Sequence, residues 1–307
     1  MAYCISRRRF ITKAGLAACA LPFVSCLRPG GGAVPEPVPG LKLGYTAITW
    51  SGNDAQAIAE ISGLGYKGVQ LRSNTLEKYG NKPEELRQLL TQNQLALAMF
   101  SGGDVNINTK NEETMLASFV AKAKFIKAIG GSDIQLTNAS RPKNGLPTPD
   151  DLVKYGRLLN EVGRRTRDLG VQASYHNHMH QLGETPQEVS AILYSCDPNN
   201  VKLLLDIGHY QQGGGDPVQA IKEHKNRLHA LHLKDVRPKA GTDPKAYVFV
   251  ELGQGKVDLA SVFSALADIK FKGWGIVELD GVPDKTKSPQ QCAQISKAYL
   301  NANGFKF

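Results

Sequence analysis

Residues 201–209 read Val-Lys-Leu-Leu-Leu-Asp-Ile-Gly-His, a short apolar run that ends in a carboxylate and an imidazole. Apolar residues also precede His176, His232 and Glu278, so the same arrangement occurs four times in the second half of the chain. The carboxyl ends of parallel strands converge when their sheet closes into a barrel. Charged groups at the ends of four apolar runs therefore predict one shared site at the mouth of a barrel.

The chain repeats this rhythm from residue 41 onward. Helix-period segments, with apolar residues three and four positions apart, separate eight apolar runs. The runs are residues 41–50, 66–72, 95–101, 133–137, 171–176, 201–206, 228–234 and 275–279. Strand and helix alternating eight times predict an α/β fold, a single-domain (β/α)8 TIM barrel over residues 41–307.

An open doubly wound sheet would also alternate strands and helices. Such a sheet normally carries a glycine-rich phosphate turn after its first strand, and residues 49–53 (Thr-Trp-Ser-Gly-Asn) lack that pattern. Residues 213–215 are three glycines that we expect between a strand and a helix, where a phosphate could bind at the helix start. A simple loop is the alternative for these glycines, and the barrel is the favoured fold.

The N-terminal region has the composition of an export leader. Arg7-Arg8-Arg9-Phe10 and the apolar segment after it resemble a twin-arginine signal over residues 1–25. Residues 26–40 are rich in Pro and Gly and predict a flexible linker. We expect the twin-arginine export machinery as a partner and a periplasmic protein, or a lipoprotein anchored to the membrane through Cys26. Cys19 is an alternative lipidation site, and a plain secreted form is the competing interpretation.

Composition limits the function classes. The 307 residues are 41% hydrophobic, and four of the nine net positive charges lie in the leader. No basic run interleaved with aromatic residues follows, so no nucleic-acid partner is predicted. Cys196 and Cys292 lack metal-ligand spacing and are expected either as buried apolar residues or as a disulfide.

The four residues at the strand ends are donors for a divalent cation. Asp206, His232 and Glu278 come from the sixth, seventh and eighth runs, and His176 ends the fifth. Carboxylate and imidazole donors suit Mn²⁺, Mg²⁺, Co²⁺ or Zn²⁺, and a catalytic site leaves coordination positions open for substrate. We therefore predict a catalytic metal site with these four ligands.

Three further residues lie within reach of this predicted site. Lys234 shares a strand face with His232, and His178 shares one with His176, because side chains alternate along a strand. Lys234 could hold a substrate hydroxyl or donate a proton. His209 follows the sixth strand, where it could contact substrate, transfer a proton or cap a loop.

The surroundings of the site give weaker signals. Residues 102–111 and 237–250 are expected as longer loops at the barrel mouth, where loops build substrate pockets. Asp235 is expected at a helix start, in a salt bridge. His229 lies on the strand face opposite His232, so we expect a structural role for it.

Taken together, the motifs resemble the sugar phosphate isomerase/epimerase family of xylose isomerase-like barrels, and within it the inosose dehydratase branch. The resemblance covers about residues 41–305 and is dense between 170 and 281. The motifs are residues 175–179 (Tyr-His-Asn-His-Met), 203–209, 232–237 (His-Leu-Lys-Asp-Val-Arg), 253–258 and 273–278 (Gly-Trp-Gly-Ile-Val-Glu).

The resemblance implies metal ligands at Asp206, His232 and Glu278. Many family members have Glu at the strand-five position, whereas this chain has His176, as the dehydratase branch does. Glu184 is then a substitute ligand or a substrate contact. Gln70 stands where many relatives end strand two with Glu, so any base role of that carboxylate is moved or lost here.

The activity implied is that of a metal-dependent isomerase, epimerase or dehydratase/lyase. It would act on a keto-sugar, keto-glycoside or cyclitol through an enediolate intermediate. Self-association into a homo-oligomer is compatible with the sequence. The expected catalytic residues are Glu278, His176, Lys234 and His209, and the expected substrate contacts are His178, Glu184 and Arg237.

Two other function classes are compatible with a barrel. A related family of DNA-repair endonucleases would need further ligands on strands two and three, where Gln70, Arg72 and residues 99–101 do not supply them. A non-catalytic, surface-tethered carbohydrate-binding barrel stays open as the alternative to an enzyme.

Overall fold

The computed structural model describes residues 38–307 apart from 138–140, 143–145 and 242–245. The predicted export leader, Cys26 and most of the predicted linker lie outside the described residues. Val38, within the predicted linker, is buried in the core, and its carbonyl accepts a hydrogen bond from the Leu41 amide.

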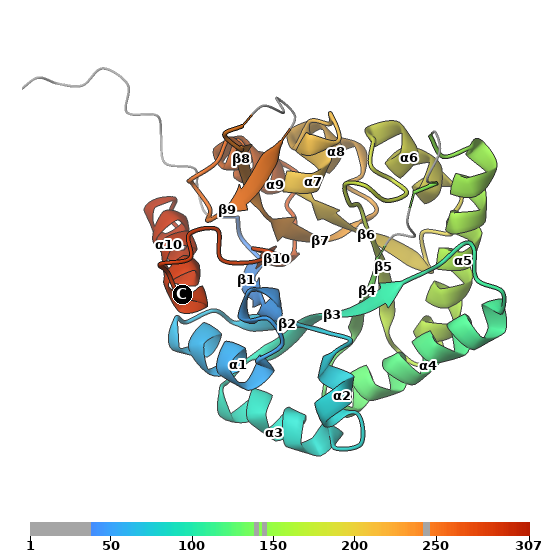
Figure 1. Cartoon of the computed structure of the whole chain (residues 1–307), viewed down its shortest axis with the longest axis horizontal. Coiled ribbons are helices and arrows are strands. Elements are labelled where there is room, and N and C mark those ends of the chain that lie inside the picture. Colours follow the sequence, from blue (N-terminus) through green and yellow to red (C-terminus); the bar gives the residue numbers. More distant parts are fainter. Residues whose placement is uncertain (1–37, 138–140, 143–145, 242–245) are drawn as a thin grey trace, which may run out of the picture. The chain divides into compact units, whose positions relative to one another are not determined.

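Eight parallel strands close into a barrel in the order β1-β10-β7-β6-β5-β4-β3-β2, which confirms the predicted TIM barrel (Figure 1). Short apolar runs form these strands because both faces of each strand are covered, one by helices and one by the barrel interior. The strands are β1 (Leu41–Thr46), β2 (Gly68–Arg72), β3 (Ala96–Asp104), β4 (Asp133–Thr137), β5 (Gln172–His176), β6 (Val201–Asp206), β7 (Leu228–Leu233) and β10 (Gly273–Val277).

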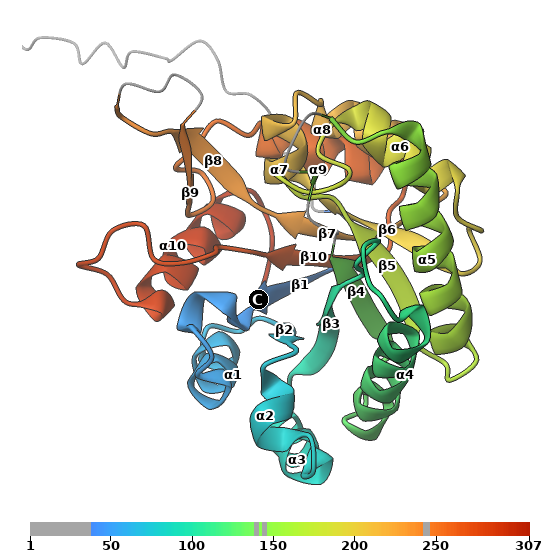
Figure 2. The same cartoon turned by 45° about the vertical axis from the view of Figure 1, so that its right-hand side comes forward.

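Helices surround the strands, as the turned view in Figure 2 makes clear. Pro at the first turn and side-chain caps start several of them, including capping boxes at Thr148 and Ser288. Within the described residues, no helix is long and apolar enough to cross a membrane. The helices are η1 (Ala47–Trp50), α1 (Asp54–Gly63), α2 (Thr75–Tyr79), α3 (Pro83–Gln92), α4 (Glu112–Ala128), α5 (Pro149–Arg167), α6 (Pro186–Tyr194), α7 (Ile207–Gln212), α8 (Pro217–Glu223), α9 (Leu259–Asp268) and α10 (Pro289–Ala302).

The interior of the barrel is filled by a small apolar cluster below the mouth. Leu204, Ala230 and Ile276 belong to it and are fully buried. Trp274 packs against this cluster from the lower end, where Gly68 makes room, because a Cβ at Gly68 would come within 2.7 Å of the indole ring. Side chains two positions further along a strand point the same way, so this packing directs the residues after the cluster into the mouth.

Some local predictions were wrong. The first apolar run does not remain extended to Trp50, because residues 47–50 turn into η1. Residues 237–250 do not form a plain loop: β8 (Asp235–Pro238) pairs antiparallel with β9 (Tyr247–Val250). The glycines at 213–215 follow helix α7 instead of a strand. The Asp216 side chain already accepts hydrogen bonds from amides at the start of α8, so nothing favours a phosphate there.

The two cysteines among the described residues are free and buried. Cys196 and Cys292 therefore behave as buried apolar residues, and the alternative of a disulfide between them was wrong.

Candidate metal centre and catalytic cavity

Four buried side chains converge at the barrel mouth. His176 and Asp206 are the last residues of β5 and β6. His232 is the second-last residue of β7, and Glu278 follows β10 directly. One ligand atom from each lies within 4.8 Å of the others, and all four residues are buried. Asp206 pairs with His232 in the β6–β7 register, and His232 pairs with Ile276 beside Glu278. Strand register thus brings together residues that are up to about a hundred positions apart in the sequence.

A hydrogen-bond network fixes the ring of His232. Its Nε2 lies 2.9 Å from the carbonyl oxygen of the Gln70 side chain. The Gln70 amide nitrogen donates in turn to Ser101 and Gln135. The Gln70 oxygen is therefore an acceptor, so the neutral ring carries its proton on Nε2 and presents the lone pair of Nδ1 to the cluster. Sequence reasoning had noted Gln70 only as a departure from the family pattern.

Hydrogen bonds fix the backbone of Asp206 and one of its carboxylate oxygens. The Asn177 side chain brackets its backbone, with hydrogen bonds to the Asp206 amide (2.9 Å) and carbonyl (3.0 Å). One carboxylate oxygen accepts from the His209 amide at 2.8 Å. The other, Oδ2, has no hydrogen-bond partner among the described residues, although His176 Nε2 and His232 Nδ1 both lie 3.5 Å away.

This geometry fits a cation. The buried Asp206 Oδ2 faces two imidazole nitrogens at 3.5 Å and the Lys234 ammonium at 3.4 Å, longer than most hydrogen bonds, which is the spacing expected when donors surround a common point. Burial lowers the pKa of His176 to about 4, so that ring is neutral, and its Nε2 lies 3.1 Å from Nδ1 of His232. Burial opposes a charge on His232, but Glu278 and Asp206 outweigh it and raise its pKa to about 9. Without a cation, His232 is therefore protonated at neutral pH, and a bound metal would take the place of the proton on Nδ1.

Lys234 is the fixed positive charge beside the cluster. Its buried ammonium donates to Glu278 at 2.8 Å and Asp280 at 2.9 Å, and lies 3.4 Å from Asp206. Burial would lower the pKa of Lys234, but these carboxylates outweigh burial and raise it well above the usual range. Lys234 therefore keeps its proton and stabilises negative charge at this position.

His209 and His178 stand next to Lys234 and His176. His209 lies on α7, with its ring nitrogen Nε2 3.2 Å from the Lys234 ammonium. Burial and the charge of Lys234 hold the pKa of His209 well below its usual range, so its ring is neutral. The His178 ring stacks over it, with 3.8 Å between centroids. Phe249 of β9 covers both His209 and Lys234 and excludes water from this side.

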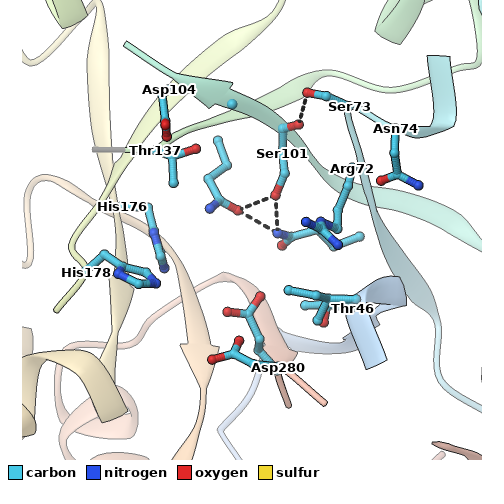
Figure 3. Close-up of a pocket in the computed structure, with 15 residues that line it drawn as sticks. Thr46, Arg72, Ser73, Asn74, Ser101, Asp104, Thr137, His176, His178 and Asp280 are labelled. Atoms are coloured by element: carbon cyan, nitrogen blue, oxygen red, sulfur yellow. Dashed lines mark hydrogen bonds between the residues drawn. The ribbon is translucent and has the colours of Figure 1, made fainter. Parts of the chain in front are cut away.

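A cavity of about 390 Å³, here called the catalytic cavity, opens beside the cluster (Figure 3). His176, His178 and Glu278 line one part of it. Strands β1–β4 line the other part with side chains that sequence reasoning did not identify as functional, because hydroxyls and amides at strand ends have no distinctive spacing. These are Thr46, Gln70, Arg72, Ser101, Asp104, Gln135 and Thr137.

The structure does not bring Glu184 and Arg237 to the cluster. Both line a different cavity of about 620 Å³ beside β8 and β9, which shares no lining residue with the catalytic cavity. Glu184 accepts from the His180 amide and lies 3.8 Å from Arg141. Substrate contact by Glu184 and Arg237 therefore stays a prediction, and in this structure both face the second cavity.

Asp235 and His229 lie near the cluster, and their contacts show what each of them does. Asp235 does not start a helix or form a salt bridge, because its carboxylate accepts hydrogen bonds from four backbone amides in residues 236–257. It fixes the loop between β9 and α9 beneath the site. His229 pairs with Asp133 away from the cavity lining, in agreement with a structural role.

The chain is similar in sequence to proteins of known name. The inosose dehydratases of Lacticaseibacillus casei and of Clostridium botulinum (strain Alaska E43 / Type E3) are each 28% identical to this chain. The alignments cover 85% of it and 97% and 96% of those proteins.

Solved structures have the same fold at low identity. A zinc-bound structure of the IolI protein superposes with a TM-score of 0.72 at 18% identity, covering 87% of this chain and 100% of that one. The 3-keto-D-glucoside 4-epimerase of E. coli gives a TM-score of 0.67 at 17% identity, covering 85% and 99%. The sequence pattern of one family matches residues 58–298, most of the barrel. The chain therefore belongs to the xylose isomerase-like TIM barrel family.

Proposed function

We propose that this protein is a divalent-metal-dependent isomerase, epimerase or dehydratase that acts on a keto-sugar, keto-glycoside or cyclitol. The observation that carries the proposal is the buried cluster of His176, Asp206, His232 and Glu278, which faces a polar cavity. Relatives named as inosose dehydratases and structural neighbours named as sugar epimerases support the substrate class.

The proposed chemistry is removal of a proton beside a carbonyl. A divalent cation held by the four ligands would polarise the substrate carbonyl and make the neighbouring C–H more acidic. Lys234 supplies a fixed positive charge next to Glu278 and would stabilise negative charge that develops on the substrate oxygens. Phe249 covers Lys234 and keeps its surroundings dry, which strengthens this interaction.

Proton transfer needs groups that change their protonation state. The His209 ring is neutral, but burial and the neighbouring Lys234 ammonium oppose its protonation, and it lies behind the stacked ring of His178, which lines the cavity itself. We assign His178 to substrate orientation and His209 to supporting it. Glu278 and Asp280 line one wall and Asp104 lines the cavity from β3, so carboxylates are available for removing and returning a proton.

The export predicted from the N-terminal residues limits which substrates the protein would meet. A twin-arginine leader carries folded proteins, which suits a chain that acquires its metal before crossing a membrane. We propose that the enzyme works outside the cytoplasm, as a periplasmic or lipid-anchored protein. It would then meet free sugars, glycosides and their keto forms, and non-phosphorylated substrates are favoured.

The test is deuterium exchange. The metal-loaded protein is incubated in D₂O with keto-sugars, keto-glycosides and inososes, and the products are followed by NMR. Deuterium uptake without loss of water indicates an isomerase or epimerase, and loss of a hydroxyl indicates a dehydratase. Protein treated with a chelator is the control and should give no exchange.

Two outcomes would contradict the proposed function. Specific binding of a sugar without deuterium uptake or water loss, with every candidate and every metal, would replace the enzyme by a carbohydrate-binding barrel. Exchange that survives complete removal of metal would contradict the role assigned to the cluster.

A further inference from the structure

The catalytic cavity does not end at the barrel mouth. A second hollow of about 760 Å³, here called the outer cavity, extends from it over the start of α1 and along α2. Ile48, Arg72, Asn74 and Asp280 line both. Because the two hollows share these four residues, they adjoin each other, and together they are here called the groove. A groove of this size can enclose more than one sugar ring.

The lining of the outer cavity suits a neutral ligand with many hydroxyl groups. Its own side chains include Asn53, Asp54, Glu77 and Lys78, so amides and charges of both signs face the same space. A hydroxyl can donate to a carboxylate and accept from an amide or an ammonium group. Asn53 and Asp54 are already bonded to Gln56 and Thr75, so the exposed Glu77 and Lys78 are the groups open to a ligand. A sugar unit satisfies them.

Arg72 stands where the two cavities join. It ends β2, its side chain is exposed, and it forms no ion pair with any described residue. Its guanidinium presents several N–H donors in a planar fork that can bind two oxygens at once. Asn74 and Asp280 line the same junction and are drawn with Arg72 in Figure 3. These residues are placed to hold the oxygens near a bond that links two sugar units.

The opposite side of the mouth does not offer the same path. The cavity that contains Glu184 and Arg237 shares no lining residue with the catalytic cavity. Phe249 packs against His209 and Lys234 on that side, and Tyr247 packs against Phe249. An extended substrate therefore leaves the cluster toward β2 and α2 and not toward β8 and β9.

From this groove we infer that the substrate is a glycoside of at least two units. Its keto ring lies at the four ligands and its second sugar unit occupies the outer cavity. The inference rests on the proposed function and narrows it, because free monosaccharides and cyclitols fill only the inner part of the groove.

The experiment compares a disaccharide with a monosaccharide. For the metal-loaded protein, kcat/KM is measured with 3-keto-cellobiose and with methyl 3-keto-D-glucoside. We expect the disaccharide to be preferred by about tenfold or more, since hydrogen bonds to charged groups contribute energies of this size. Lys78→Ala and Glu77→Ala remove exposed side chains of α2 that line the outer cavity, and each should lower the ratio of disaccharide to monosaccharide several-fold. Lys82→Ala, an exposed lysine that lines neither cavity, should leave the ratio unchanged.

Binding measured by calorimetry separates this inference from the proposed function. If both sugars react with equal kcat/KM and the α2 variants do not alter the ratio, the inference is overturned and the enzyme assignment stands. If neither reacts but the disaccharide binds more tightly and Lys78→Ala abolishes the difference, the groove assignment stands and the enzyme assignment fails. If neither sugar binds, the inference is overturned.

Discussion

The two halves of the barrel mouth differ in chemistry. Strands β10, β7, β6 and β5 are neighbours and supply the four ligands together with the adjacent Lys234. Strands β4, β3, β2 and β1 complete the ring, and their cavity-lining ends are mainly hydroxyls and amides. One half thus holds the metal ligands, here called the charged half, and the other, here called the neutral half, provides mainly neutral hydrogen-bonding groups, with Arg72 and Asp104 as its charged members. One fold can therefore separate activation of a substrate from its recognition.

A side-chain hydrogen bond links the two halves across the mouth. Gln70 on the neutral half accepts from His232 on the charged half, across the barrel mouth. Gln70 is itself fixed by Ser101 and Gln135, so the neutral half also orients a ligand. The two halves therefore differ in charge, but the hydrogen bond between Gln70 and His232 connects them.

The largest effect is expected from Asp206→Asn, which removes the central charge of the charged half. Metal catalysis is worth several kcal/mol, so we expect turnover to fall by about a thousandfold. Bound metal, measured by mass spectrometry of the purified protein, should fall with it. Asp268→Asn replaces an exposed aspartate at the end of α9 and should change neither value. Full activity of Asp206→Asn would mean that the charged half is structural.

A second substitution in the charged half, Lys234→Met, should separate binding from catalysis. Removing the ammonium leaves Asp206, Glu278 and Asp280 without their cation, so metal should bind at least as tightly as before. kcat should nevertheless fall by about a hundredfold, because a preorganised positive charge is lost. Metal titration and steady-state kinetics measure the two effects. Lys225→Met, on the surface, is the matched control, and parallel losses of affinity and kcat would contradict this role.

Gln70→Leu tests the coupling between the halves. Without the acceptor, His232 loses the partner that fixes its tautomer, and metal affinity should fall about 10- to 100-fold. Competition with a chelating dye measures that affinity. Gln92→Leu, at an exposed position of α3, should have no effect. An unchanged affinity would show that the hydrogen bond between Gln70 and His232 does not orient the ligand.

The smallest effect is expected from the neutral half. Thr137→Val keeps the shape of a side chain that lines the catalytic cavity but removes its hydroxyl. Loss of one hydrogen bond should raise KM about fivefold, with kcat and metal content unchanged. Thr91→Val, on the exposed end of α3, is the control. A fall in kcat as large as that of Lys234→Met would erase the distinction between the halves.

The charged half was predictable from the sequence and most of the neutral half was not. Asp206, His232 and Glu278 each end an apolar run, and strand periodicity with barrel closure is enough to bring such residues together. Thr137 also ends a strand and Gln135 lies two positions before it, but amides and hydroxyls occur near many strand ends without a binding role. Their function becomes visible only through the cavity that they line.

The positions of loop residues could not be predicted from the sequence either. Periodicity carries no information on how residues 237–250 pair, so the hairpin that brings Phe249 over Lys234 could not be foreseen. For the same reason Glu184 and Arg237 were expected at the cluster but lie in a separate cavity. Tertiary contacts decide these positions, and a single sequence does not report them.

The position of Trp274 has a kinetic consequence. Because the indole and the apolar residues above it fill the lower part of the barrel among the described residues, substrate and product both reach the four ligands through the mouth. Product must depart by the route that incoming substrate uses, so the two cannot pass each other. Accumulated product should accordingly act as a competitive inhibitor, and turnover at high conversion should slow more than substrate depletion alone explains.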